Sequence, residues 1–145
     1  MQSFIYPARL KPDPVDGGFV VTFTDFPEAI TQGEDVEDAL HEAADCLDEA
    51  IVNRIVMGLP IPLPSCVEKG CYPVPLAAQS AAKAALYFAL QEARMTKVVL
   101  AKRLGCDEKE VRRLLDPRHP SKLPRLEAAL AAIGRRLIIG FQATN

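Results

Sequence analysis

The sequence lacks several features that would place it in a common class of protein. No apolar run approaches the roughly 20 residues that a membrane-spanning helix needs. The first residues, MQSFIYPARLK, lack the basic start and long apolar core of a signal peptide. We therefore expect a cytoplasmic protein with no membrane partner, in which the four cysteines stay reduced.

Residue patterns that hold a metal or a phosphate are also scarce. Cys66 and Cys71 are spaced C-x4-C, but no second cysteine pair or nearby histidine follows them. For Cys46 and Cys106, a buried structural role is the better interpretation. There is no glycine-rich phosphate loop, and no nucleophile has a base at a recognisable spacing. The sequence accordingly predicts neither a metal site nor a cofactor.

Carboxylates near the N-terminus leave a nuclease open as an alternative. Two-metal hydrolysis needs several acids that converge on ions about 3.5–4 Å apart. The candidates lie in a predicted turn and at the end of a predicted strand: Asp13, Asp16, Asp25 and Glu28. None falls in the middle of a strand, where such sites place an acid. The sequence therefore favours an inactive scaffold over an enzyme.

What the sequence does contain is an ordinary folded-protein composition with an uneven distribution of charge. Hydrophobic residues make up 49% and charged residues 25%. Residues 1–72 carry 4 Lys and Arg against 13 Asp and Glu, a net charge of −9; residues 73–145 carry 13 against 6, a net charge of +7. This asymmetry predicts a basic protein as partner for the first half and DNA for the second. The alternative is that the two halves differ in net charge by chance, and that the charged residues only keep the chain soluble.

The first half has the pattern of a small sheet with one helix. Aromatic and β-branched stretches predict strands at residues 4–10, 19–24, 29–32 and 72–76. Before the last strand, a helix starts at Glu34 and Asp35 and ends at Gly58, and proline-rich LPIPLPS follows it. An apolar stripe of helical period marks its inner face: Val36, Leu40, Ala43, Leu47, Ile51 and Ile55. This β-β-β-α-β order leaves the other face of the sheet open.

The stretch from Met95 to Leu115 organises the second half. Two short helices are predicted, because Gly105 ends the first and Asp107 caps the second, with Glu110 in the third position of a capping box. The expected apolar contacts between them are Val98, Val99, Ala101, Leu104, Val111, Leu114 and Leu115. The pattern favours a helix-turn-helix, although a plain helical hairpin with a solvated charged face has the same periodicity.

Basic side chains around this helix pair are the predicted DNA contacts. Three of them fall on one face of the second helix and are expected in the major groove: Lys109, Arg112 and Arg113. Three others are expected to contact phosphates: Lys97, Lys102 and Lys122. The alternative for Arg112 is an exposed ion pair with Glu108 one turn earlier.

The remaining segments complete a predicted helical domain. One helix is expected over residues 76–94 and another from Pro124 through Ile133, ended by Gly134. The tail RRLIIGF is predicted to form a short strand that pairs with its own copy in a second subunit. The fold class is therefore α+β, with residues 1–75 as one domain. Residues 76–145 form an all-α helix-turn-helix domain with a short C-terminal strand.

Several segments, taken in order, carry a resemblance to a known family. In the first half they are GGFVVTFTDFPEAITQGED, DALHEAADCLDEAI and GLPIPLPS. In the second half they are AAKAALYFAL, LAKRLGCDEKEVRRLLDPRHPSKL and LEAALAAIGRRL. The chain so arranged resembles the HicB antitoxin family of type II toxin–antitoxin systems.

This resemblance implies a partial ribonuclease-H-like N-terminal domain that sequesters a HicA toxin, a small messenger-RNA-cleaving ribonuclease. It also implies that the C-terminal domain binds its own operator DNA as a homodimer or higher homo-oligomer. One departure from an ideal DNA reader is the pair Asp107 and Glu108, because carboxylates repel phosphate, although glutamate can accept from a cytosine amino group.

The resulting hypothesis is a non-enzymatic antitoxin that represses its own operon. The expected toxin contact is the acidic corner Asp25, Phe26, Pro27 and Glu28. The alternatives are a ribonuclease-H-like nuclease that uses the N-terminal carboxylates, and a DNA-binding regulator without a toxin partner.

Overall fold

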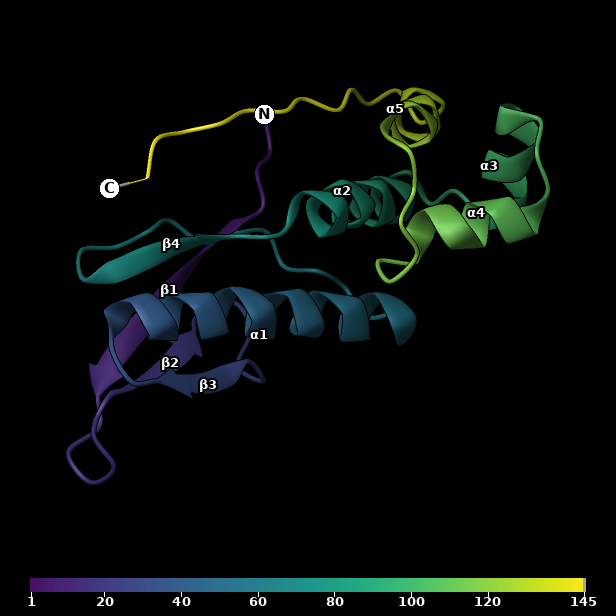
Figure 1. The fold of residues 1–145 in the computed structure, drawn as a ribbon. Coiled ribbons are helices and arrows are strands. Elements are labelled where there is room, and N and C mark those ends of the chain that lie inside the picture. The colour runs from purple at the N-terminus through teal and green to yellow at the C-terminus, as the bar shows by residue number, and fades with distance from the viewer. Residues whose placement is uncertain (145) are drawn as a thin grey trace. The chain divides into compact units, whose positions relative to one another are not determined.

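The computed structural model describes residues 1–144, which divide into two compact units (Figure 1). The first unit is Met1–Ala81 and the second begins at Ala82. The division falls inside helix α2 (Ala78–Ala93), so that one continuous helix contributes residues to both units. The domain boundary was expected after residue 75, the last residue of strand β4 (Cys71–Pro75), whereas the two units divide after Ala81.

The first unit is a four-stranded antiparallel sheet with one long helix against it. Strands β1 (Ile5–Pro12), β2 (Phe19–Phe23) and β3 (Ile30–Gly33) join β4 in the order β3-β2-β1-β4. Helix α1 (Val36–Val56) contacts all four strands and runs along the sheet in Figure 1. The α+β class and the predicted β-β-β-α-β order are therefore confirmed.

The core of this unit lies between α1 and one face of the sheet. Tyr6 of β1 pairs with Val74 of β4, and Ala8 pairs with Phe23 of β2; all four are buried. The buried residues of α1 are Ala39, Ala43, Leu47, Ala50, Ile51 and Val52. The predicted stripe was right at its centre but wrong at Val36, which is 36% exposed. The buried face of α1 includes small alanines beside the large apolar side chains of the stripe. It is therefore wider than the predicted stripe alone.

The start of α1 depends on close packing around a glycine. The carboxylate of Asp35 caps the helix by accepting from the backbone N–H of Asp38 at 2.8 Å. A Cβ atom added at Gly33 would lie 2.3 Å from the backbone nitrogen of Ala39 and 2.4 Å from its Cα. Only glycine therefore lets the end of β3 approach the first turn of α1 this closely.

The second unit packs its helices around a single apolar core. Helices α3 (Lys97–Leu104) and α4 (Glu108–Leu115) are the predicted helix pair, and α5 (Leu123–Ala131) follows them. Gly105 ends α3 with a φ of 67°, and Asp107 caps α4 by accepting from the N–H of Glu110 at 2.9 Å. Both helix boundaries were therefore correctly predicted from these two residues.

The predicted apolar contacts were right for α4 and partly wrong for α3. Val111, Leu114 and Leu115 of α4 are buried, and so is Ala101 of α3. Val98 and Val99 are instead 46% and 40% exposed, while Leu100, omitted from the prediction, is fully buried. The run VVLA offers four consecutive apolar residues to a helix that can bury only one side. Its sequence does not determine which side that is.

A fully buried lysine ties the second unit together. The ammonium of Lys83 on α2 donates to the backbone carbonyl of Arg113 and to the hydroxyl of Ser121, both at 2.8 Å. Burial lowers the pKa of this ammonium, and the nearby carboxylate of Asp116 opposes that shift. Lys83 thereby joins α2 to the end of α4 and to the loop that leads into α5.

The segment after α5 forms no strand within the described part of the chain. Ile138, Ile139 and Phe141 are largely or fully exposed along residues 135–144. The expected C-terminal strand is thus absent from the single chain. The prediction paired this strand with a second copy, and one chain by itself supplies no such edge.

Replacing Gly33 by alanine should destabilise the first unit, because the new methyl group would collide with the backbone of Ala39. We expect the free energy of unfolding to fall by about 1–3 kcal/mol, measured by urea titration with circular dichroism. Gly140→Ala is the matched control, since a Cβ there meets no atom within 4 Å. Equal midpoints for both variants would contradict the close packing at β3.

Candidate functional site

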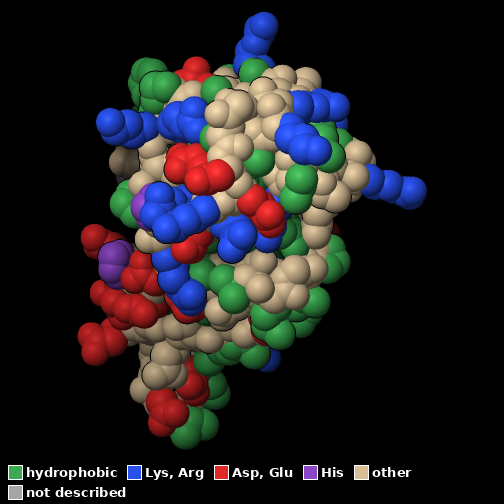
Figure 2. All heavy atoms as spheres, turned by 90° about the vertical axis from the view of Figure 1, so that its right-hand side faces the viewer, with side chains coloured by type: hydrophobic (Ala, Val, Ile, Leu, Met, Phe, Trp, Pro, Cys, Tyr) green, Lys and Arg blue, Asp and Glu red, His purple; other side chains and the backbone are tan. Residues whose placement is uncertain are grey.

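The outer face of α4 carries all of its basic residues. Lys109, Arg112 and Arg113 are exposed, whereas the apolar residues on the opposite face are buried. The structure therefore brings the three residues predicted for the major groove onto one accessible face. Figure 2 shows lysine and arginine side chains, in blue, gathered over this helical unit with a few carboxylates between them.

Carboxylates of the same helix lie beside these arginines. A carboxylate oxygen of Glu108 is 3.7 Å from the guanidinium of Arg112, so the exposed ion pair considered from the sequence is present. Glu110 lies between two guanidiniums, 3.9 Å from Arg113 and 3.8 Å from Arg125 of α5. Exposed pairs of this kind add little to stability.

The three lysines predicted to contact phosphates lie on different elements. Lys97 begins α3, Lys102 lies in its last turn, and both are exposed. Lys122 is the N-cap residue of α5. A hollow of about 380 Å³ between α4 and α5 brings Lys122 together with α4, and its lining is Glu110, Leu114, His119, Pro120, Ser121, Lys122 and Arg125. Arg125 was missed from the sequence because no spacing relates it to Glu110, 15 residues earlier.

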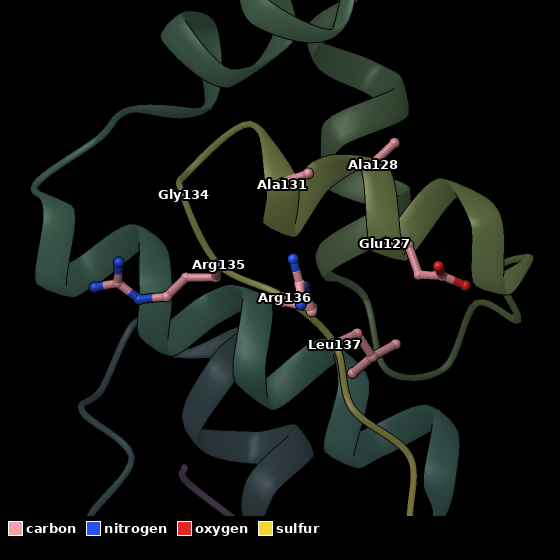
Figure 3. Close-up of a pocket in the computed structure, with 7 residues that line it drawn as sticks. All are labelled: Glu127, Ala128, Ala131, Gly134, Arg135, Arg136 and Leu137. Carbon is pink, nitrogen blue, oxygen red and sulfur yellow. The ribbon is translucent and has the colours of Figure 1, made fainter.

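A second hollow, of about 650 Å³, lies beside α5 (Figure 3). Glu127, Ala128 and Ala131 line it from the helix, and Gly134 and residues 135–137 line it from the following segment. In Figure 3, Arg136 points toward α5 and Arg135 points away from the hollow. Arg135 pairs with Glu92 of α2 at 3.1 Å. The sequence contained no signal for this hollow.

In the first unit, the corner expected to contact a toxin is built into the fold. Phe26 is fully buried, and its ring meets that of Tyr6 edge-on with the centroids 4.9 Å apart. The guanidinium of Arg54 lies 4.9 Å from the Phe26 centroid and donates to Glu28 at 2.8–3.0 Å. Of this corner, Pro27 and Glu28 remain accessible.

The same side chains hold the proline-rich segment of residues 59–65 in one conformation. Arg54 donates to the Pro60 carbonyl, the hydroxyl of Tyr6 donates to the Pro62 carbonyl, and Ser65 donates to the carboxylate of Asp25. Burial, and secondarily the charge of Asp25, raises the pKa of Tyr6 well above its usual range, so that its hydroxyl stays protonated and donates. Leu59 and Leu63 point outward from this fixed segment and are exposed.

Three of the four carboxylates considered for a nuclease, Asp13, Asp25 and Glu28, have structural partners. Asp13 accepts from the backbone N–H groups of Val15 and Asp16 within the turn, as its position there suggested. Asp25 and Glu28 bind Ser65 and Arg54, as described above. Among residues 1–144, no three His, Cys, Asp or Glu side chains are grouped to hold a metal ion.

No helix in the described part of the chain is long and apolar enough to span a bilayer.

Comparison with known proteins gives consistent matches. A family model described as the HicB_like antitoxin of bacterial toxin-antitoxin systems matches residues 5–85. Antitoxin HicB 1 of Photorhabdus laumondii is 36% identical over 142 residues, which cover 98% of this chain and 90% of that protein. Antitoxin HicB of Escherichia coli strain K12 is 35% identical over 132 residues, covering 91% and 95% respectively. Antitoxin HicB of Pseudomonas fluorescens is 32% identical over 141 residues, covering 97% and 95%.

These relatives are named as antitoxins, which agrees with a non-enzymatic regulatory protein and gives no support to the nuclease alternative. The family model spans all of the first unit's sheet and α1. The relatives extend the similarity through the helix pair and α5. On this basis, the chain belongs to the HicB-like antitoxin family of bacterial toxin–antitoxin systems.

Proposed function

We propose that this protein sequesters a HicA-type, messenger-RNA-cleaving toxin through its first unit and represses its own operon through α4. The observation that carries the proposal is the amphipathic build of α4. Three cations face solvent, and the apolar side is buried against the rest of the helical unit. In a chain of an antitoxin family, such a helix is best explained as a DNA reader that controls the antitoxin's own synthesis.

For DNA, we assign α4 to the major groove, which is about 12 Å wide and admits a helix. Arg112 and Arg113 can each grip guanine through two atoms, whereas Lys109 offers a single charged group. Lys97, Lys102 and Lys122 would contact phosphates and set the register without reading sequence. Phosphate contact explains why the positive charge of the chain is concentrated in this half.

For the toxin, we assign the corner of residues 25–28 together with the proline-rich segment that it supports. A protein that binds messenger RNA is expected to be basic. The net charge of −9 over residues 1–72 would therefore speed the association of the two proteins. Asp25 and Phe26 act by holding the segment in place, while Pro27 and Glu28 offer surface. Leu59 and Leu63 add exposed apolar groups of the kind that hold a complex together once formed.

For assembly, we assign the tail after α5 to pairing with a second copy. Ile138, Ile139 and Phe141 leave apolar side chains in solvent, and pairing would cover them. A dimer would then place two α4 helices on successive turns of the duplex, about 34–36 Å apart.

Leu63→Asp should weaken toxin binding about tenfold or more, because it puts a charge into an apolar contact. The affinity is measured by calorimetry with the protein encoded beside this gene. Val15→Asp is the matched control, since Val15 is also exposed but lies in the turn between β1 and β2. An equal loss of affinity in both variants would mean that the toxin contacts another part of the chain. Absence of any neighbouring small basic protein would favour a regulator without a toxin.

Arg113→Ala should cost about 1–3 kcal/mol on the operator and relax the preference at one base pair. Lys122→Ala should instead weaken binding to all sequences alike and reduce the salt dependence. Gel-shift titrations at several salt concentrations measure both effects. Normal operator binding by a folded variant with alanine at Lys109, Arg112 and Arg113 would rule out α4 as the reader.

Ile138→Pro should lower the mass of the assembly, because proline removes a backbone donor from the tail and blocks edge pairing. Light scattering coupled to size exclusion measures the mass, and Ile138→Val, which keeps the donor and the apolar character, is the control. An unchanged mass in the proline variant would place the assembly on another surface, such as the open face of the first unit's sheet.

A further inference from the structure

Two glutamates interrupt the basic face of α4. Asp107, just before the helix, is explained by its capping bond to the N–H of Glu110. The side chains of Glu108 and Glu110 take no part in that bond, and both are partly exposed beside the arginines. Acidic residues in the first turn favour the helix dipole, but negative charge at these positions weakens the attraction of the helix for DNA.

Each glutamate has a particular arginine within reach. Glu108 lies one helical turn before Arg112, with 3.7 Å between carboxylate and guanidinium. Glu110 contacts Arg113 with one oxygen at 3.9 Å and Arg125 with the other at 3.8 Å. An arginine held beside a carboxylate keeps fewer of its rotamers, and part of its positive charge is offset before DNA approaches.

The two kinds of DNA contact respond differently to such pairing. Non-specific binding to DNA depends almost entirely on the neutralisation of phosphates. Every carboxylate on the face that approaches the DNA therefore lowers the non-specific affinity. A bidentate contact with guanine is short-ranged and directional, and it gains from an arginine that is already oriented. The carboxylates therefore weaken binding to random DNA more than binding to the correct site, and this difference is what specificity consists of.

We propose that Glu108 and Glu110 are specificity-determining residues of α4, which restrain Arg112 and Arg113 and suppress binding to DNA that lacks the operator. This inference rests on the proposed function of α4 as the DNA reader. It assigns the departure from an ideal basic helix to discrimination between sequences.

The test uses the full chain with Glu108→Gln, Glu110→Gln and the double variant, since glutamine keeps the shape and removes the charge. Affinity is measured at several salt concentrations for a duplex from directly upstream of the gene and for a scrambled duplex of equal length. We expect each change to raise affinity for the scrambled duplex about fivefold. The slope of log affinity against log salt concentration should steepen by about one. Affinity for the upstream duplex should change less, so the ratio between the two should fall in each variant.

Glu92→Gln is the matched control, because Glu92 is also a partly exposed carboxylate paired with an arginine, but on α2. This variant should leave the ratio of the two affinities at the wild-type value. Thermal unfolding of all variants checks that α4 stays folded. An unchanged ratio in the α4 variants, or an equal fall in Glu92→Gln, would overturn the inference while leaving the proposed function standing. A wild-type chain that shows no preference for the upstream duplex would overturn the proposed function and this inference with it.

Discussion

The buried ammonium of Lys83 is the contact on which the geometry of the second unit depends. A charge out of water is costly unless hydrogen bonds replace its hydration. Lys83 meets this condition with the carbonyl of Arg113 and the hydroxyl of Ser121, and Asp116 adds a favourable charge nearby. Because one acceptor belongs to the last turn of α4 and the other to the following loop, the end of the basic helix is fixed to α2. The exposed basic side chains of α4 thus extend from a helix whose end is held in place.

A cation has a similar organising role in the first unit. Arg54, near the end of α1, binds Glu28, lies over the ring of Phe26 and donates to the carbonyl of Pro60. One guanidinium therefore joins the long helix, the corner after β2 and the proline-rich segment. The acidic corner works mainly as a support. The surface that it supports includes the exposed leucines of that segment, so these apolar side chains are held in place in a stretch without helix or strand.

Local features of the sequence determined much of the fold. The caps at Asp35 and Asp107, the left-handed Gly105 and the spacing of apolar residues on α4 all act within one or two turns. Their geometry follows from backbone sterics and from hydrogen bonds between near neighbours, which any sequence with this pattern satisfies in the same way. For that reason the element order, both helices of the predicted pair and the basic face of α4 could be inferred before the structure.

Tertiary structure alone decided which side chains are covered and which are paired. Leu100 rather than Val98 turned inward, and Phe26 of the expected contact corner became core. Lys83 lost its solvent, although lysine at that place in an alanine-rich helix predicts exposure. The carboxylate of Glu110 acquired a second arginine from another helix. These outcomes depend on which surfaces pack against one another in the folded chain. The periodicity of the sequence does not specify which surfaces those are.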